Sequence, residues 1–112
     1  MVEQFPTAVR PFYTMPNKDN PFYSNSYDFF MRGEEILSGS QRINDYEMLV
    51  KSAKDRNIDL TKIASYLEAF KYGAPLHGGG GIGLERVVMF YLGINDIRNV
   101  SLFPRDPVRL DP

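Results

Sequence analysis

Hydrophobic and polar positions alternate through residues 26–43, which is the pattern of a half-buried β-strand. Tyr27 and Phe29 fall on one face of this stretch, and Asp28 falls on the other. Gly33 interrupts the alternation. We therefore predict two antiparallel strands joined by a turn at this glycine.

Two helices are predicted after these strands. Asp45 is typical of a helix N-cap, and Met48, Leu49 and Ala53 fall on one side of a helix that should end near Lys54. A second helix is predicted between the N-cap Asp59 and the terminating Gly73. Its apolar residues recur at helical spacing and predict a core-facing stripe made of Ile63, Tyr66, Leu67 and Phe70.

A glycine-rich strand and an apolar helix come next. In the strand predicted at residues 78–83, glycines occupy the alternate positions 79, 81 and 83, so one face would carry no side chains and would allow close approach of a ligand. Residues 84–92 are apolar nearly all round, so we expect a buried helix, which Gly93 ends. Strands, then helices, then strand and helix predict an α+β fold, an antiparallel β-sheet flanked by helices.

The two ends of the chain are rich in proline. Prolines at five-residue intervals in residues 1–23 exclude a helix there and leave only short or edge strands. Residues 101–112 are proline-rich and charged, and we expect them to form a surface segment.

Composition narrows the function classes. The 112 residues form one domain or part of one. A net charge of −1, from 13 basic and 14 acidic residues, gives no overall electrostatic case for binding nucleic acid or a membrane. The chain has no cysteine, which excludes disulfides and Cys-ligated zinc, and its single His77 cannot build a multi-His metal site. No apolar run approaches the ~20 residues of a membrane span.

The glycine strand is the first candidate site. Arg86 follows it at the start of the apolar helix, where free backbone N–H groups also favour anions. A flat slot that ends in a fixed cation suits a nucleotide. The alternative is that the four consecutive glycines are only a flexible turn.

Polar residues of the two predicted strands form a second candidate site. Asp28 and Glu35 flank the Gly33 break, so strand pairing can bring together two carboxylates of the kind that bind Mg²⁺. Glu35 and Ser38 are an odd number of residues apart, so in a regular strand their side chains would point to opposite faces. Both can face one site only if the strand bulges near Gly39 or if one of them contributes its backbone. The alternative is an ordinary solvated strand face.

Arg42 shares a strand face with Ser38 and Ser40. Its planar guanidinium offers a fork of donors that could hold a carboxylate through two hydrogen bonds.

Three segments carry a family resemblance. GGGIGLERVV at residues 79–88 resembles motif 3 of the class II aminoacyl-tRNA synthetases. RGEEILSGSQRI at residues 32–43 and FPRDP at residues 103–107 resemble the aspartate/asparagine/lysine subgroup of these enzymes. Within that subgroup they are most similar to aspartyl-tRNA synthetases of the archaeal/eukaryotic type.

The resemblance implies a cytoplasmic, homodimeric enzyme that uses ATP and Mg²⁺ to activate L-aspartate and then transfers it to the 3′ end of tRNA(Asp). It implies no catalytic side chain. It assigns ATP binding to Glu35, Gly83, Leu84, Glu85 and Arg86, metal binding to Asp28 and Glu35, and aspartate binding to Ser38 and Arg42.

The chain departs from the family pattern in two ways. Asn44 stands where the aspartate enzymes commonly carry His. Motifs 1 and 2 are absent, so we expect residues 1–112 to be the C-terminal part of a catalytic domain, inactive by itself. The alternatives are a fragment of an asparaginyl-tRNA synthetase and a non-catalytic, synthetase-like binding or assembly module.

Overall fold

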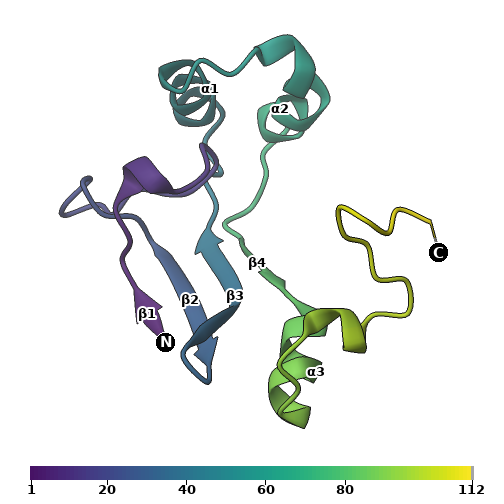
Figure 1. The fold of residues 1–112 in the computed structure, drawn as a ribbon. Helices are drawn as coiled ribbons and strands as arrows, with labels where there is room; N and C mark the ends of the chain where they lie inside the picture. The colour runs from purple at the N-terminus through teal and green to yellow at the C-terminus, as the bar shows by residue number, and fades with distance from the viewer. Residues whose placement is uncertain (112) are drawn as a thin grey trace.

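The computed structural model describes residues 1–111 and contains one antiparallel sheet with the strands in sequence order (Figure 1). The middle strands β2 and β3 have the longest pairing, and β4 lines the free side of β3. The four strands are β1 (Val2–Glu3), β2 (Ser26–Met31), β3 (Glu34–Gln41) and β4 (Gly78–Ile82). The sheet predicted from the sequence is confirmed.

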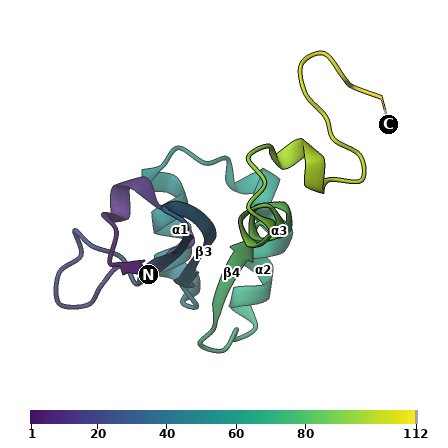
Figure 2. The same ribbon diagram turned by 60° about the horizontal axis from the view of Figure 1, so that its bottom comes forward.

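Helices lie at both ends of the sheet (Figures 1 and 2). Two α-helices lie where β3 ends and β4 begins, and the third follows β4 at the opposite end. They are α1 (Tyr46–Asp55), α2 (Ala64–Lys71) and α3 (Leu84–Leu92). Short 3₁₀ helices occupy Thr7–Val9 (η1), Leu60–Ile63 (η2) and Ile97–Val100 (η3).

The turn between β2 and β3 forms as predicted. Met31 pairs with Glu34, so only Arg32 and Gly33 lie in the loop, with φ angles of 53° and 86°. Two positive φ angles define the type I′ turn, whose twist matches that of the strands it joins. Gly33 adopts this backbone without strain, whereas Arg32 is one of the few non-glycine residues in the left-handed region.

Aspartate caps start the helical segments as predicted. The Asp45 carboxylate accepts a hydrogen bond from the backbone N–H of Met48 at 2.7 Å, and Asp59 accepts one from Thr61 at 3.0 Å. The segment after Asp59 begins as η2 and becomes α2 only at Ala64.

The core lies where α1 and α2 meet the end of β3. Ile43, Leu49, Leu67 and Phe70 are buried together there. Met48 was predicted to face the same way, but this is wrong, since it is 45% exposed.

The predicted burial of α3 is also wrong. Met89 and Phe90 are buried, but Leu84, Tyr91 and Leu92 are exposed. The helix contacts mainly η3 and the end of the sheet, which cover one side of it. The chain is accordingly extended, with a radius of gyration of 17.4 Å, whereas a compact chain of this length would have about 13 Å.

Residues before β2 have little regular structure but are tied to α1. The Arg56 guanidinium donates to the backbone carbonyls of Arg10 at 2.5 Å and Thr7 at 2.7 Å. The exclusion of helix from residues 1–23 fails only for the three-residue turn of η1.

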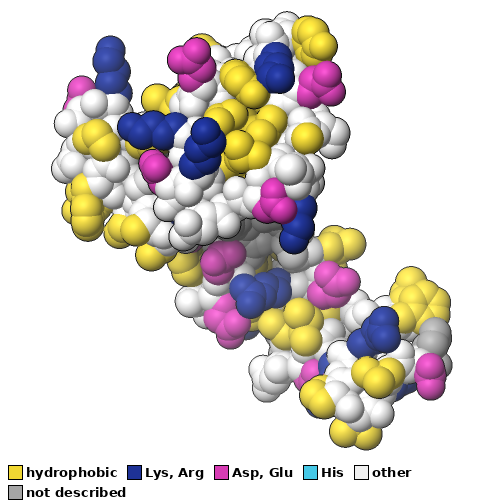
Figure 3. All heavy atoms as spheres, turned by 90° about the horizontal axis from the view of Figure 1, so that it is seen from above, with side chains coloured by type: hydrophobic (Ala, Val, Ile, Leu, Met, Phe, Trp, Pro, Cys, Tyr) yellow, Lys and Arg dark blue, Asp and Glu magenta, His cyan; other side chains and the backbone are white. Residues whose placement is uncertain are grey.

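The surface carries charges of both signs. Figure 3 shows Lys and Arg among Asp and Glu side chains, with hydrophobic groups between them. Across residues 1–111, no helix is both long and apolar enough to cross a membrane.

Candidate functional site

A β-bulge determines which side chains share the polar face of β2 and β3. Asp28 pairs with Ser38 and Phe29 with Leu37, but Phe30 pairs with Glu35, which leaves Ile36 as an extra residue in β3. Directly opposed residues of an antiparallel pair point to the same face. Glu35 therefore lies on the same face as Asp28 and Ser38. A bulge near Gly39 was one of the two ways in which Glu35 and Ser38 could share a site; a bulge is present, but at Ile36.

Asp28 and Ser38 are joined by Arg10, a residue that the strand pattern did not single out. The Arg10 Nη2 atom lies 2.7 Å from Asp28 Oδ2, and Nη1 donates to Ser38 Oγ at 2.7 Å. The pair is buried, because the Arg10 and Asp28 side chains are 11% and 6% exposed. The other carboxylate oxygen, Asp28 Oδ1, is buried with no hydrogen-bond partner among the described residues.

The Arg42 guanidinium lies over an aromatic ring. Its central carbon is 4.0 Å from the centroid of the Tyr13 ring. On the β4 side, a Cβ built on Gly79 would lie 3.2 Å from Arg42 Nη2 and 3.3 Å from Nε. Within residues 1–111 the guanidinium makes no ion pair, and the hydrogen bond recorded for Arg42 is the one its backbone N–H donates to the His77 carbonyl at 3.0 Å.

Tyr66 lies near the same guanidinium. Partial burial raises the pKa of Tyr66 above its usual value of 10.0, and the positive charge of Arg42 offsets part of this rise. The charge of Arg42 is thus felt by a tyrosine of α2, a segment distant from Arg42 in the sequence.

The glycine strand leaves an open face next to Ser38 and Ser40. Gly79 pairs with Ser40 and Gly81 pairs with Ser38, so both glycines point to the polar face. A Cβ built on Gly81 would meet no atom within 4 Å. The side-chain-free face that the alternating glycines predicted is therefore open at Gly81, whereas at Gly79 the Arg42 guanidinium lies next to it.

Gly83 and Arg86 join the site through backbone atoms of the bulge. The Gly83 N–H donates to the carbonyl of Ile36 at 2.9 Å, and Arg86 Nη1 donates to the carbonyl of Glu35 at 2.6 Å. Gly83 also packs on the stem of Arg86, because a Cβ there would lie 3.5 Å from the Arg86 Cβ. The start of α3 is thereby fixed beside Glu35.

Leu84 and Glu85 point elsewhere. Both line a cavity of about 300 Å³ formed with η3 and residues 101–103, and Glu85 also lines a second cavity near Arg98 and Arg105. The structure thus brings Gly83 and Arg86 to Glu35 and turns the two residues between them toward the C-terminal segment.

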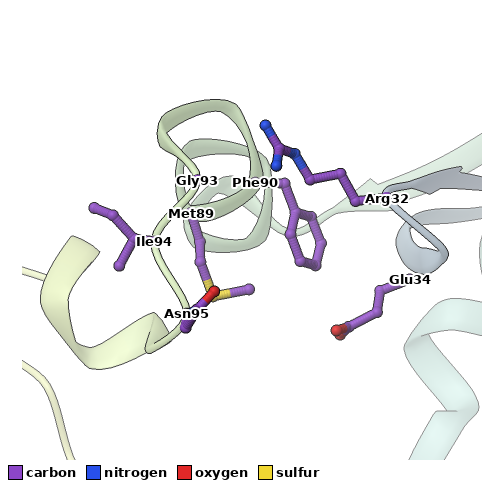
Figure 4. A pocket seen from close by; sticks show the side chains of 7 residues that line it. All are labelled: Arg32, Glu34, Met89, Phe90, Gly93, Ile94 and Asn95. Carbon is purple, nitrogen blue, oxygen red and sulfur yellow. The ribbon is translucent and has the colours of Figure 1, made fainter.

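A separate cavity of about 220 Å³ lies between the β2–β3 turn and the end of α3 (Figure 4). The side chains of Arg32 and Glu34 extend from the turn toward Phe90 and Asn95 of the α3 region. None of the residues predicted to bind ATP, metal or aspartate lines this cavity. Of those residues, Asp28, Glu35 and Ser38 lie on the polar face of the sheet instead.

The carboxylates on this face fit a metal ion that also keeps water and substrate oxygens as ligands. Residues 1–111 contain no cluster of three or more His, Cys, Asp or Glu able to hold a metal ion by themselves. Mg²⁺ is commonly held by one or two carboxylates together with water and substrate phosphates. Glu35 and the unpartnered Oδ1 of Asp28, on one face, match that smaller requirement.

Sequence reasoning missed Arg10 and Tyr13. Both lie in the proline-rich segment, where no periodic pattern assigns a side chain to a face. The proximity of this segment to β3, through pairing of Thr14 with Arg42, is visible only in the fold.

Comparison with known proteins supplies the family. The family model of the class II tRNA synthetases (D, K and N) matches residues 1–107. The chain belongs to this family. It spans about a fifth of the length of the curated synthetases it matches, such as the cytoplasmic aspartate–tRNA ligase of Caenorhabditis elegans, which is 63% identical over all 112 residues, 21% of the relative's length.

Solved synthetase structures share the fold. The aspartyl-tRNA synthetase of Entamoeba histolytica has a TM-score of 0.93 and 56% identity, covering 98% of this chain and 23% of that one. An asparaginyl-tRNA synthetase of Pyrococcus horikoshii complexed with asparaginyl-adenylate has the same TM-score of 0.93 but 34% identity, over 99% of this chain and 26% of that one. The predicted class II synthetase architecture is thus confirmed.

Proposed function

We propose that this chain forms part of the active site of a cytoplasmic aspartate–tRNA ligase. Such an enzyme activates L-aspartate with ATP to give aspartyl-adenylate and pyrophosphate, and then transfers the aspartyl group to the 3′ end of tRNA(Asp). The identity to enzymes named for aspartate, 56% and 63%, against 34% to the asparagine enzyme supports aspartate as the amino acid. The asparaginyl alternative is less supported.

The observation that carries the proposal is the Arg42 guanidinium, which makes no ion pair within residues 1–111. It lies over the Tyr13 ring, and the Gly79 backbone lies close on the β4 side. Its N–H donors remain available for a ligand, and a planar fork of donors matches a carboxylate in two parallel hydrogen bonds. We assign Arg42 to the side-chain carboxylate of aspartate, with Ser38 as a second contact.

The nucleotide is assigned to the glycine strand and the start of α3. An adenine ring can lie against the backbone at Gly81, where an added Cβ would meet no atom within 4 Å. Arg86, held by the Glu35 carbonyl and placed in the first turn of α3, supplies positive charge next to that strand. Gly83 completes the proposed ATP-binding segment, to which Leu84 and Glu85 would contribute their backbone, since their side chains line cavities with the C-terminal segment.

Glu35 would hold Mg²⁺, with Asp28 Oδ1 as the second protein oxygen. When bound, the ion would neutralise phosphate charge during attack of the aspartate carboxylate on the α-phosphate. The residues of this chain bind and orient the two substrates, so no side-chain general base is required of them. The remaining ligands would be water and phosphate oxygens. Homodimerisation and tRNA binding belong to the proposal for the full-length enzyme.

ATP–pyrophosphate exchange tests the proposal. The full-length protein should exchange with aspartate but not with asparagine or lysine. Arg42→Lys should raise the KM for aspartate at least tenfold and change the KM for ATP little, since losing one charge-assisted hydrogen bond costs about 1.5–3 kcal/mol and about 1.4 kcal/mol is tenfold.

Arg32→Lys is a matched control, because Arg32 lines the cavity at the β2–β3 turn, which none of the predicted binding residues lines. Exchange that depends on asparagine would favour the asparaginyl alternative. Absence of exchange with any amino acid would favour the non-catalytic module.

A further inference from the structure

The sequence around Arg42, which directly follows β3, does not explain what holds its side chain in place. An arginine side chain has many rotamers, and holding one of them costs conformational entropy. A free guanidinium would also lose affinity through ordering when it binds a ligand. Arg42 forms no ion pair within residues 1–111 that would restrain it. Its restraint therefore comes from packing.

Two independent contacts supply that packing. The Tyr13 ring lies 4.0 Å from the guanidinium carbon. Gly79 leaves room on the β4 side, because an added Cβ would be only 3.2 Å from Nη2 and 3.3 Å from Nε. An added Cβ at Gly79 would be farther from the central carbon of the guanidinium, at 3.7 Å, so Gly79 faces the Nε–Nη2 side, the fork of donors that a carboxylate would use.

The Tyr13 ring is itself held by its surroundings. The backbone N–H of Ile43 donates to the Tyr13 carbonyl at 2.9 Å, so Tyr13 is tied to the residue that follows Arg42. The Phe12 ring packs edge-on against Tyr13, with ring centroids 5.3 Å apart, and also against Tyr66. These contacts do not involve Arg42, so the ring has restraints of its own.

We propose that Tyr13 and Gly79 are positioning residues that hold Arg42 ready to bind a carboxylate. This inference rests on the proposed function of Arg42 and adds two residues to it. The Tyr13 ring supplies the stacking surface, and Gly79 supplies the space. The Tyr13 hydroxyl has no part in the arrangement.

Aspartate binding to the full-length protein tests the inference by titration calorimetry, with ATP binding measured in parallel. Tyr13→Leu should raise the aspartate Kd about 3- to 30-fold, the range set by a cation–π contact of about 0.6–2 kcal/mol. It should change the ATP Kd less than about twofold, a difference well below 1.4 kcal/mol. Tyr13→Phe keeps the ring and should bind aspartate like the unmodified protein.

Gly79→Ala tests the second contact without touching the aromatic ring. Its Cβ should displace the guanidinium and raise the aspartate Kd, whereas Gly78→Ala should not. Gly78 is the matched control because it is adjacent in β4 and its added Cβ would meet only the Ser40 carbonyl, at an ordinary 3.5 Å. This pair remains decisive if Tyr13→Leu does not fold.

Three outcomes would overturn the inference. Tyr13→Leu and Gly79→Ala could leave the aspartate Kd unchanged, Tyr13→Phe could be as impaired as Tyr13→Leu, or aspartate and ATP binding could weaken equally. Arg42→Lys, measured alongside, separates these failures from failure of the proposed function. If Arg42→Lys weakens aspartate binding while the Tyr13 and Gly79 variants do not, only the positioning role is wrong. If Arg42→Lys also has no effect, the assignment of Arg42 itself is wrong.

Discussion

The buried ion pair between Arg10 and Asp28 should contribute strongly to stability. Arg10 Nη2 lies 2.7 Å from Asp28 Oδ2, and both side chains are almost fully buried. Arg10 also donates to Ser38, and its guanidinium carbon lies 4.0 Å from the centroid of the Phe5 ring. Arg10→Met keeps much of the side-chain length and apolar contact but removes the charge and every donor.

The expected loss of stability depends on which buried group each variant leaves without its partner. Arg10→Met leaves a buried carboxylate without its cation, which typically costs about 3–5 kcal/mol. Asp28→Asn leaves Arg10 with Ser38 and Phe5, so we expect a smaller loss of about 1–3 kcal/mol. The double variant removes both charges, and its loss should fall short of the sum of the two single losses by at least about 1 kcal/mol.

Urea denaturation of the full-length protein, followed by circular dichroism, measures these losses as shifts of the midpoint at constant slope. Arg98→Met is the control, since Arg98 pairs with Asp96 and Asp106 at the surface with 55% of its side chain exposed. Its midpoint should stay at that of the unmodified protein. The reasoning from burial is refuted if Arg10→Met denatures at the same urea concentration as Arg98→Met, or if the two single losses simply add.

Two further predictions concern other parts of the chain. Gly39→Ala should lower the urea midpoint, because a Cβ on Gly39 would lie 2.6 Å from the Tyr27 ring. Gly81→Ala should leave the midpoint unchanged, because a Cβ on Gly81 would meet nothing within 4 Å. Equal midpoints for the two variants would contradict this. The Arg109 N–H and the Arg98 side chain lower the pKa of Asp106 below 3.8, so the turn they form should be stable above that pH and be lost as the pH falls through the lowered pKa. The Arg109 amide resonance should report this loss in an NMR titration, and Asp106→Asn should abolish the titration.

Local signals in the sequence predicted the elements well. Asp45, Asp59, Gly33 and Gly93 mark their turns or helix ends because caps and left-handed glycines depend on neighbouring residues alone. The strands β2, β3 and β4 followed from alternation and from the glycine pattern in the same way.

Predictions that depended on tertiary packing were less accurate. Burial of Leu84, Tyr91 and Leu92 required something to cover every side of α3, and hydrophobic composition does not reveal the covering partner. The faces of β3 could not be assigned by counting alone, because the position of the extra residue depends on pairing with β2.

The site was only partly predictable for the same reason. Arg42 and the glycine strand were found because each stands out within its own segment. Arg10 and Tyr13 act through contacts with residues 18 to 29 positions further along the chain, and the sequence of residues 1–23 contains no pattern that indicates such contacts.

The extra residue in β3 also has a consequence for protein engineering. Ile36 contributes its carbonyl to Gly83, while the Glu35 carbonyl receives Arg86, so the β3 backbone fixes where α3 starts. A different side chain at position 36 leaves those carbonyls in place. Removing the residue would make the β2–β3 ladder regular and reduce its local twist, which would withdraw the acceptor from Gly83. This strand should therefore tolerate substitution at Ile36 far better than a change of length, and libraries built on this scaffold should vary its residues without insertions or deletions between Glu35 and Ser38.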